Sequence, residues 1–399
     1  PALSIRVVGT TTGSVTNISV IEVTDDTNLP RINYDGFSYD GSGAIIPNSG
    51  CGSWLFEPQS TNLITYSEDF SNAAWVKQNV TVASNNATSP DGTTNADTLI
   101  PSTSNVNHFL NQDSSITSGT TYTQSIYAKA NAYSFLQITG SSGFASVYQN
   151  FNLNDGTLGS TDGGIATITN CGNGWYRCTY TLTATSTTGG GRFIIAIVSL
   201  STSGRIAAFS GNGTDGISLY GAQLEQQSYA TSYIPTEGTT VTRNQDVCTN
   251  GGSAALISST EGVLYAEIAA LANDGTTRSI SISDGTTGNR VVIRYRPTDG
   301  QIQMLVANGG AIESIITENN LSVTSFIKVA VKYKENDFAL WINGVEVGTN
   351  NSGVTPINLA ELSFNSGLLG NNLFFGKTKC LAVWKTALTD TELAELTTI

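Results

Sequence analysis

The chain has 399 residues and a formal net charge of −13; only 12% of its residues are charged and 39% are hydrophobic. This length is too great for one β-sandwich and predicts two or three domains. The hydrophobic and aromatic content excludes an intrinsically disordered chain. No cluster of Lys and Arg is evident, so nucleic-acid binding is not expected. The negative charge makes Ca²⁺ a more natural partner, although an acidic surface also simply keeps a protein in solution.

No run of 18 apolar residues occurs, so insertion into a membrane is not expected. No signal peptide is evident either. The chain begins at Pro1 inside a strand pattern and its single methionine is Met304. We therefore expect it to be a fragment or a processed product of a longer protein.

Residues 1–54 are predicted to form N-terminal strands and a linker. Residues 4–8 and 18–23 alternate as strands do, and residues 25–60 are rich in Gly and carry three prolines. The strand at 18–23 resembles residues 216–225 in pattern. It is either the closing strand of a preceding domain or a chance similarity between two strands.

Residues 55–247 are predicted to form an antiparallel sandwich. The stretches 122–128, 134–138, 176–182 and 192–198 alternate, with Gly, Asn and Ser turns between them. Four sequence motifs follow in order: N-L-I-T-Y-S-E-D-F-S-N-A-A-W, S-P-D-G-T-T-N-A-D-T-L, G-N-G-W-Y-R and G-A-Q-L-E-Q-Q-S-Y-A-T-S-Y-I-P-T. Together they resemble a carbohydrate-binding jelly-roll module that is common in bacteriophage tail fibres and related virion proteins. The resemblance covers about residues 50–247.

This resemblance implies a sugar ligand and a structural calcium ion. Sugars stack on aromatic rings, and the candidates for glycan contact are Tyr133, Tyr148, Trp75 and Trp175. The two tryptophans rank second, because packing is the favoured explanation of both, and Tyr122 and Tyr180 are expected in the core. The calcium site of such modules is matched here by three acidic residues, Glu68, Asp69 and Glu225.

Five cysteines occur without a CxxC motif. Cys171 and Cys178 flank G-N-G-W-Y-R, so they are either a disulfide across a hairpin or two buried thiols. Cys51, Cys248 and Cys380 are scattered, and they predict no disulfide framework.

Residues 248–399 are predicted to form a second sandwich. Residues 327–334 alternate between apolar and polar, residues 338–342 form the next apolar face, and Asn343-Gly344 is a strong hairpin signal. Thr389 and Glu392 have the spacing of a capping box that opens a short helix. The order of strand, W-I-N-G hairpin and W-K-T-A-L-T-D-T-E-L resembles laminin-G/concanavalin-A-like lectin sandwiches over about residues 255–399. That fold usually binds glycans or proteins, and only some of its branches are hydrolases.

Catalysis is not expected. A glycosidase needs two carboxylates across the scissile bond, and the closest acidic spacing in the second sandwich, Glu335 and Asp337, falls in a turn between strands. The single histidine, His108, has no nucleophile motif beside it. We therefore expect an all-β protein that is not an enzyme.

The expected function is that of a phage virion appendage, a tail or head fibre or adhesin that contacts host surface glycan outside the cell. The alternatives are a structural decoration protein without a glycan ligand and the non-catalytic part of a polysaccharide depolymerase. Expected partners are the host glycan, other virion proteins and further copies of this chain, as a homotrimer.

Overall fold

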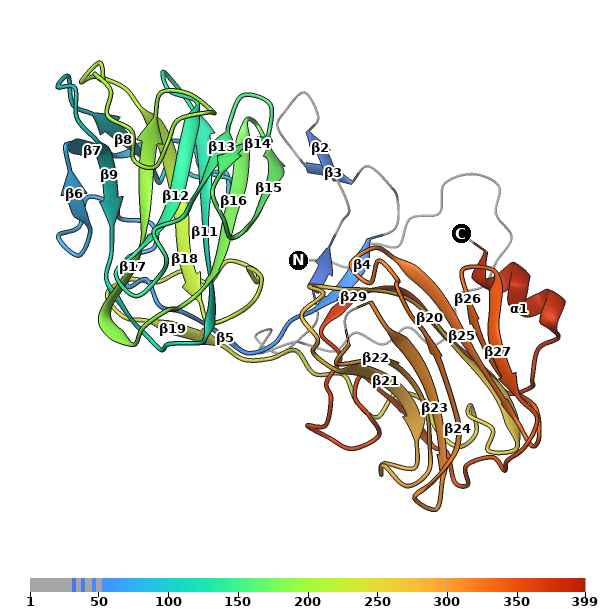
Figure 1. Ribbon diagram of the computed structural model, residues 1–399. Coiled ribbons are helices and arrows are strands. Elements are labelled where there is room, and N and C mark those ends of the chain that lie inside the picture. The colour runs from blue at the N-terminus through green and yellow to red at the C-terminus, as the bar shows by residue number, and fades with distance from the viewer. Residues whose placement is uncertain (1–30, 34–36, 40–44, 48–51, 299, 399) are drawn as a thin grey trace, which may run out of the picture.

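The computed structural model describes residues 31–33, 37–39, 45–47, 52–298 and 300–398, and for the residues before 52 only the backbone. Within these residues the chain forms two β-sandwiches (Figure 1). The all-β fold predicted from the sequence is confirmed. The predicted strands at 4–8 and 18–23, and Cys51, lie outside the described residues.

The N-terminal sandwich, blue to yellow in Figure 1, consists of two facing sheets. In the first, β10 (Ser114–Ile116) pairs with β17, and the other strands follow in the order β14 (Thr157–Thr161), β13 (Tyr148–Asn152), β12 (Phe135–Ser141), β17 (Thr188–Val198), β9 (His108–Asn111) and β6 (Val76–Gln78). In the second, the order is β15 (Ile165–Gly172), β16 (Trp175–Thr183), β11 (Thr121–Ala130), β18 (Ile217–Glu225), β8 (Ala96–Pro101) and β7 (Val80–Ala87). A ribbon of β5 (Ser60–Asn62) and β19 (Val241–Arg243) adjoins them.

The alternation that predicted these strands also accounts for their core. Inward residues of both sheets, among them Ile126, Ile138, Tyr180 and Ile195, are buried in one apolar cluster. Tyr122 belongs to the same cluster, so its predicted core position is confirmed together with that of Tyr180. Burial of these side chains from water stabilises the sandwich.

The C-terminal sandwich, orange to red in Figure 1 except for the blue strands β1 and β4, also has two sheets. One runs in the order β1 (Arg31–Asn33), β4 (Ser53–Phe56), β29 (Gly376–Trp384), β20 (Glu261–Ala270), β25 (Ile327–Lys334), β26 (Phe338–Ile342) and β27 (Val345–Asn350). The other runs in the order β24 (Ala311–Glu318), β23 (Ile302–Asn308), β22 (Arg290–Tyr295), β21 (Arg278–Ser283) and β28 (Glu361–Ser363). A separate short pair consists of β2 (Phe37–Tyr39) and β3 (Ile45–Pro47).

The hairpin and helix predicted here form as expected. Val329, Val331 and Tyr333 of β25 face the core. Asn343 and Gly344 both have positive φ, 49° and 83°, which a two-residue primed turn requires.

The helix α1 (Asp390–Thr397) begins with the complete capping box between Thr389 and Glu392. It covers the outer face of the seven-stranded sheet, where Leu393 packs beside Tyr265 and Trp341. No helix among the described residues is long and apolar enough to cross a membrane.

One segment departs from the predicted boundary between residues 54 and 55. Residues 53–56 form β4, which pairs with β29 of the C-terminal sandwich, and Phe56 stacks on Phe364 with ring centroids 4.2 Å apart. The chain therefore visits the C-terminal sandwich before it builds the N-terminal one. Besides β1, the partner of β4 is β29, which lies more than 300 residues later, and no local pattern reveals such a pairing.

A buried polar network joins Glu57, which directly follows β4, to residues 232–246, where the chain leaves the N-terminal sandwich. Glu57 accepts a hydrogen bond from the backbone N–H of Ser232 (2.7 Å) and forms an ion pair with Arg243 (2.7 Å). The N–H of Glu57 donates to Asp246. Ser228 of the N-terminal sandwich donates to Asp274 of the C-terminal one (2.8 Å).

Candidate functional site

A groove with acidic walls opens on the N-terminal sandwich. Its larger hollow, with a volume of about 640 Å³, is lined by residues from two segments: Tyr66, Glu68, Asp69, Pro235, Thr236, Glu237, Thr239 and Val241. A smaller hollow of about 230 Å³ shares Glu68 and Asp69 and adds Ser71, Ser84, Asn85, Asn95 and Asp97. We call the two adjoining hollows the acidic groove. The larger hollow has the size of typical small-ligand sites.

Backbone contacts hold the two walls of the acidic groove together. Tyr66 forms an isolated antiparallel bridge with Glu237, and the N–H of Gly238 donates to Thr65 (2.7 Å). Gly238 has a φ of +92°, which a residue with a side chain rarely adopts. The glycine therefore permits the sharp turn that brings residues 235–241 beside residues 65–69.

The carboxylates of the groove differ in what they already bind. Glu68 accepts hydrogen bonds from Tyr233 (2.9 Å) and from Asn95 (3.2 Å), which orient it. Asp69 is exposed; burial raises its pKa, but hydrogen bonds from Ser71 and Asn72 outweigh this and hold the pKa below its usual range. Asp69 is therefore ionised at neutral pH and places a negative charge in the groove that it lines.

Asp97 has a different role at the base of the smaller hollow. Its two oxygens accept the backbone N–H groups of Asn85 and Phe70, each at 2.9 Å. Burial raises its pKa against these two hydrogen bonds, and the charge of Asp69 raises it further. The side chain is 2% exposed, so it anchors the backbone of the groove.

Two buried side-chain oxygens in the groove lack a hydrogen-bond partner. Thr236 is 8% exposed, and its Oγ1 has no partner, although its backbone N–H donates to Ser67 (2.8 Å). In the smaller hollow, Oδ1 of Asn95 is also buried without a partner. Native proteins rarely leave such atoms unpaired, so these two are suited to a ligand hydroxyl.

Apolar surface completes the groove. Tyr66 is partly exposed, and Pro235 and Val241 are exposed beside it. A ring flanked by carboxylates and hydroxyls offers both kinds of contact that a sugar needs, a stacking face and hydrogen-bond partners.

The predicted sugar contacts at Trp75 and Trp175 are wrong. Each indole is only 2% exposed. The Nε1 of Trp75 donates to the backbone oxygen of Tyr66 (2.8 Å), and that of Trp175 to Thr88 (3.0 Å). Both therefore pack and anchor loops, the alternative that the sequence left open, because a buried indole needs a partner for its N–H.

Tyr133 and Tyr148 are each partly exposed but belong to other parts of the sandwich. Tyr133 packs on Phe209 with centroids 5.5 Å apart. Tyr148 begins β13, and its N–H donates to Asp162. Neither lines the acidic groove, and their predicted sugar contact stays a prediction.

The structure does not bring the predicted calcium ligands together. Glu68 and Asp69 line the groove, but Glu225 is fully buried and accepts hydrogen bonds from Ser60 (2.6 Å), Gln223 (2.6 Å) and Thr231. No group of three or more His, Cys, Asp or Glu side chains that could hold a metal occurs in the described part of the chain. Glu225 is a buried anchor because neighbouring donors already satisfy its carboxylate.

The remaining candidates from the sequence are structural. Both ring nitrogens of His108, which is fully buried, lie against backbone oxygens of Asn79 (2.8 Å) and Phe209 (2.9 Å). Asp337 pairs with Lys332 (2.7 Å) in the turn between β25 and β26.

No disulfide joins Cys171 to Cys178. Cys178 packs in the inner core while Cys171 packs in a separate cluster around Trp175, so the disulfide does not form.

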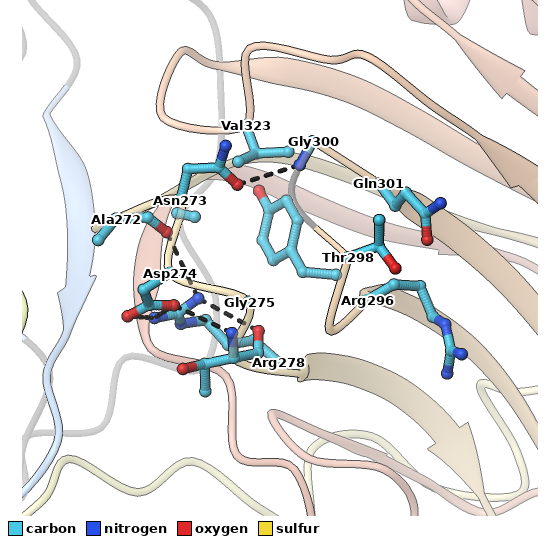
Figure 2. A pocket seen from close by; sticks show the side chains of 13 residues that line it. Ala272, Asn273, Asp274, Gly275, Arg278, Arg296, Thr298, Gly300, Gln301 and Val323 are labelled. Carbon is cyan, nitrogen blue, oxygen red and sulfur yellow. Dashed lines mark hydrogen bonds and ion pairs between the residues drawn. The ribbon is translucent and has the colours of Figure 1, made fainter. Parts of the chain in front are cut away.

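A second hollow lies at the loops of the C-terminal sandwich (Figure 2). Its volume is about 10 Å³, room for about one water molecule. Figure 2 shows that Arg278 and Asp274, which line it, are joined directly by two hydrogen bonds of 2.9 Å, and that the backbone N–H of Gly300 donates to Asn273 (3.0 Å). This hollow is closed by its own polar contacts, which makes the acidic groove the better candidate.

The sequence analysis missed Tyr66 and Thr236. Tyr66 stands two residues before Glu68 inside the first quoted motif, so its place next to two predicted acidic residues was a usable signal. Thr236 carries no signal of its own, because its importance depends on a missing hydrogen bond that only the structure reveals.

Comparison with known proteins supports the fold of the second sandwich. Residues 264–394 match the family model of the Concanavalin A-like lectin/glucanases superfamily, a laminin G type. The C-terminal region therefore carries a laminin G/concanavalin A-like lectin/glucanase domain, as predicted. No curated protein matches the chain.

Among solved structures, the mouse laminin alpha1 chain, domains LG4-5, is similar at 11% sequence identity, with a TM-score of 0.25; the alignment covers 72% of this chain and 90% of that one. The resemblance of residues 50–247 to a phage module stays a prediction.

Proposed function

We propose that this protein binds carbohydrate without cleaving it and that the acidic groove is its sugar site. The observation that carries the proposal is the pair of buried, unpaired oxygens, Thr236 Oγ1 and Asn95 Oδ1, in an open groove lined by carboxylates and a tyrosine. A sugar presents several hydroxyls on a small frame, so it can satisfy both atoms and stack on Tyr66 at once.

Binding is favoured over cleavage by the state of the groove carboxylates. A catalytic acid and base are usually two neighbouring carboxyl groups, one with a raised pKa and one with a lowered pKa. In the groove the pKa of Asp97 is raised and that of Asp69 is lowered. Asp97, however, is buried and uses both oxygens to hold backbone N–H groups. A general acid must reach the leaving oxygen, and this one faces the backbone instead.

We further propose that the protein serves as an adhesin on a bacteriophage virion, outside the cell, and that its ligand belongs to the host surface. The support is the resemblance of residues 50–247 to phage carbohydrate-binding modules. The match of residues 264–394 to a lectin/glucanase superfamily agrees with a role in glycan recognition.

A glycan array that includes host lipopolysaccharide tests this function. We expect binding to neutral oligosaccharides that is weakened by Tyr66→Ala and by Glu237→Gln. Glu237 is exposed and lines the groove, so its replacement by an amide keeps the shape and removes the charge. Glu346→Gln on the C-terminal sandwich, also exposed, is the matched control.

The array also separates the alternatives. Release of reducing ends from a bound polysaccharide that is lost in Asp69→Asn would overturn the non-catalytic assignment. Absence of any glycan signal from the intact chain would favour a structural decoration protein. Binding that survives both groove substitutions would place the sugar site elsewhere.

A further inference from the structure

Three arginines stand on one face of the five-stranded sheet. Arg290 and Arg294 lie on β22, and Arg296 follows it directly. Because side chains alternate along a strand, these three project away from Val291, Ile293 and Tyr295, which lie in the core. At about 3.3 Å per residue, the arginines are spaced by roughly 13 Å and 7 Å. We call them the arginine row.

The arginines of the row bond to neutral groups, although Glu361 lies on the same face two strands from Arg290, because both align with Ser283. Among the described residues, none of the three arginines forms an ion pair with an Asp or Glu side chain. Arg290 bonds to the hydroxyl of Ser366 (2.6 Å) and to its backbone oxygen, and Arg294 bonds to the amide oxygen of Gln303 (2.5 and 3.0 Å). Both partners are neutral.

The three charges are also close enough to oppose one another. Burial, followed by the charges of Arg296 and Arg290, lowers the pKa of Arg294 to about 10. In a chain with a net charge of −13, three mutually repelling cations without an acidic partner are an unusual concentration of one sign. Such an arrangement is favourable when an anion binds there.

Unpaired polar atoms beneath the arginine row supply a second, independent observation. Ser279 and Ser281 of β21 share the outer face, since Ser279 is the register partner of Arg294 and Ser281 that of Val292. Both serines are fully buried, and neither hydroxyl has a hydrogen-bond partner. Arg290 Nε is likewise buried and unpaired.

We propose that the arginine row binds an acidic polysaccharide whose carboxylates repeat along the chain. A guanidinium presents a planar fork that matches a carboxylate with two parallel hydrogen bonds. The neutral hydrogen-bond partners of the row, Gln303 and Ser366, suit the hydroxyls of the same polymer. This site is distinct from the acidic groove, whose carboxylates repel such a ligand, so it does not depend on the sugar site proposed above.

The composition of the outer face favours a polysaccharide over a nucleic acid. The described residues of the outer face include no aromatic side chain on which a base could stack.

The test uses the intact chain and polygalacturonate as the probe, with dextran as the neutral comparison. Biolayer interferometry at low salt should show binding of polygalacturonate that weakens by roughly tenfold in Arg294→Gln, the effect of losing one charge-assisted contact. Arg294→Lys keeps the charge but lacks the planar guanidinium, so we expect a loss of affinity between that of the native chain and that of Arg294→Gln. Lys334→Gln is the charge-matched control, because Lys334 is exposed on the opposite sheet. A thermal melt of each variant shows that it is folded.

The outcomes decide between the two sites. No binding of polygalacturonate by the native chain, or binding unchanged in Arg294→Gln and Arg296→Gln, would overturn the proposal. Equal, arginine-dependent binding of single-stranded RNA would show a general polyanion site and would also overturn it. Binding of neutral glycans at the groove should be the same in the arginine variants, so failure of one site leaves the other testable.

Discussion

Replacing Thr236 with valine removes one hydroxyl from the acidic groove and leaves the shape of the side chain almost unchanged. In the structure this hydroxyl has no partner, although the residue is 8% exposed. The backbone of Thr236 is held by Ser67, whose N–H donates to its oxygen and whose Oγ accepts from its N–H. These contacts do not involve the hydroxyl, so Thr236→Val should leave the groove in place.

The expected effects on stability and on affinity have opposite signs. A buried, unpaired polar group costs about 1–3 kcal/mol, and the small remaining exposure of Thr236 places it near the low end. Relief of about 1 kcal/mol should raise the melting temperature by roughly 2–4 °C for a domain of this size. Loss of a hydrogen bond to the sugar, about 0.5–1.5 kcal/mol, should weaken binding by roughly 2- to 13-fold.

Differential scanning fluorimetry and isothermal titration of the best neutral glycan from the array measure both effects on the same samples. Thr169→Val is the matched control, since Thr169 is exposed on β15 and does not line the groove. A variant that is less stable than the native chain would show that the hydroxyl has a partner in solution. A more stable variant with unchanged affinity would refute the sugar contact at Thr236.

Three further predictions concern the buried residues and the charges. Trp175→Ala should destabilise the N-terminal sandwich by about 3–5 kcal/mol, because the indole is buried and hydrogen-bonded to Thr88; an unchanged denaturation midpoint would contradict its packing role. Burial raises the pKa of Asp274, but the Arg278 guanidinium and hydrogen bonds outweigh it and hold the pKa below its usual range. A depressed pKa in the folded state stabilises the fold above the unfolded-state pKa of about 3.9 and ceases to do so as the pH falls through the folded-state value; Asp274→Asn should therefore flatten the loss of melting temperature below about pH 4. Finally, iodoacetamide should label exposed Cys380 in the native protein but Cys178 only after denaturation, since burial raises the pKa of the Cys178 thiol well above its usual range; mass spectrometry of the two peptides checks this.

Local chemistry explains what the sequence revealed of the fold. The alternation of residues 327–334, the Asn343-Gly344 turn and the capping box at Thr389 each act over a few residues, and all three form as predicted. The pairing of β4 with β29 joins residues more than 300 positions apart, so no local pattern could indicate it.

The candidate site was less predictable because a side chain can bind a ligand only where its neighbours in the fold leave its hydrogen-bonding groups without a partner. The sequence motif points to Glu68 and Asp69, which do line the groove. It also groups Glu225 with them, but the carboxylate of Glu225 already accepts hydrogen bonds from Ser60, Gln223 and Thr231. The two tryptophans were candidates because aromatic rings bind sugars, and the same property makes them good core residues.

The arginine row was present in the sequence as R-V-V-I-R-Y-R, yet no basic cluster was recognised. Only the strand geometry aligns positions 290, 294 and 296 on one face, and only the structure shows that Arg290 and Arg294 bond to the neutral groups of Ser366 and Gln303.

Ionic strength separates the two proposed surfaces without any substitution. Contacts at the acidic groove join a neutral sugar to carboxylates, hydroxyls and a ring, so they are only weakly affected by screening. Contacts at the arginine row join opposite charges on a partly exposed face, and the Debye length there falls from about 10 Å at 0.1 M salt to about 3 Å at 1 M. We expect that titration of the best neutral glycan from the array across this range shows a nearly constant affinity, whereas titration of polygalacturonate shows that most of its affinity is lost at high salt. Parallel loss of both affinities would mean that the two ligands share one electrostatic surface, and it would contradict the assignment of separate sites to the two sandwiches.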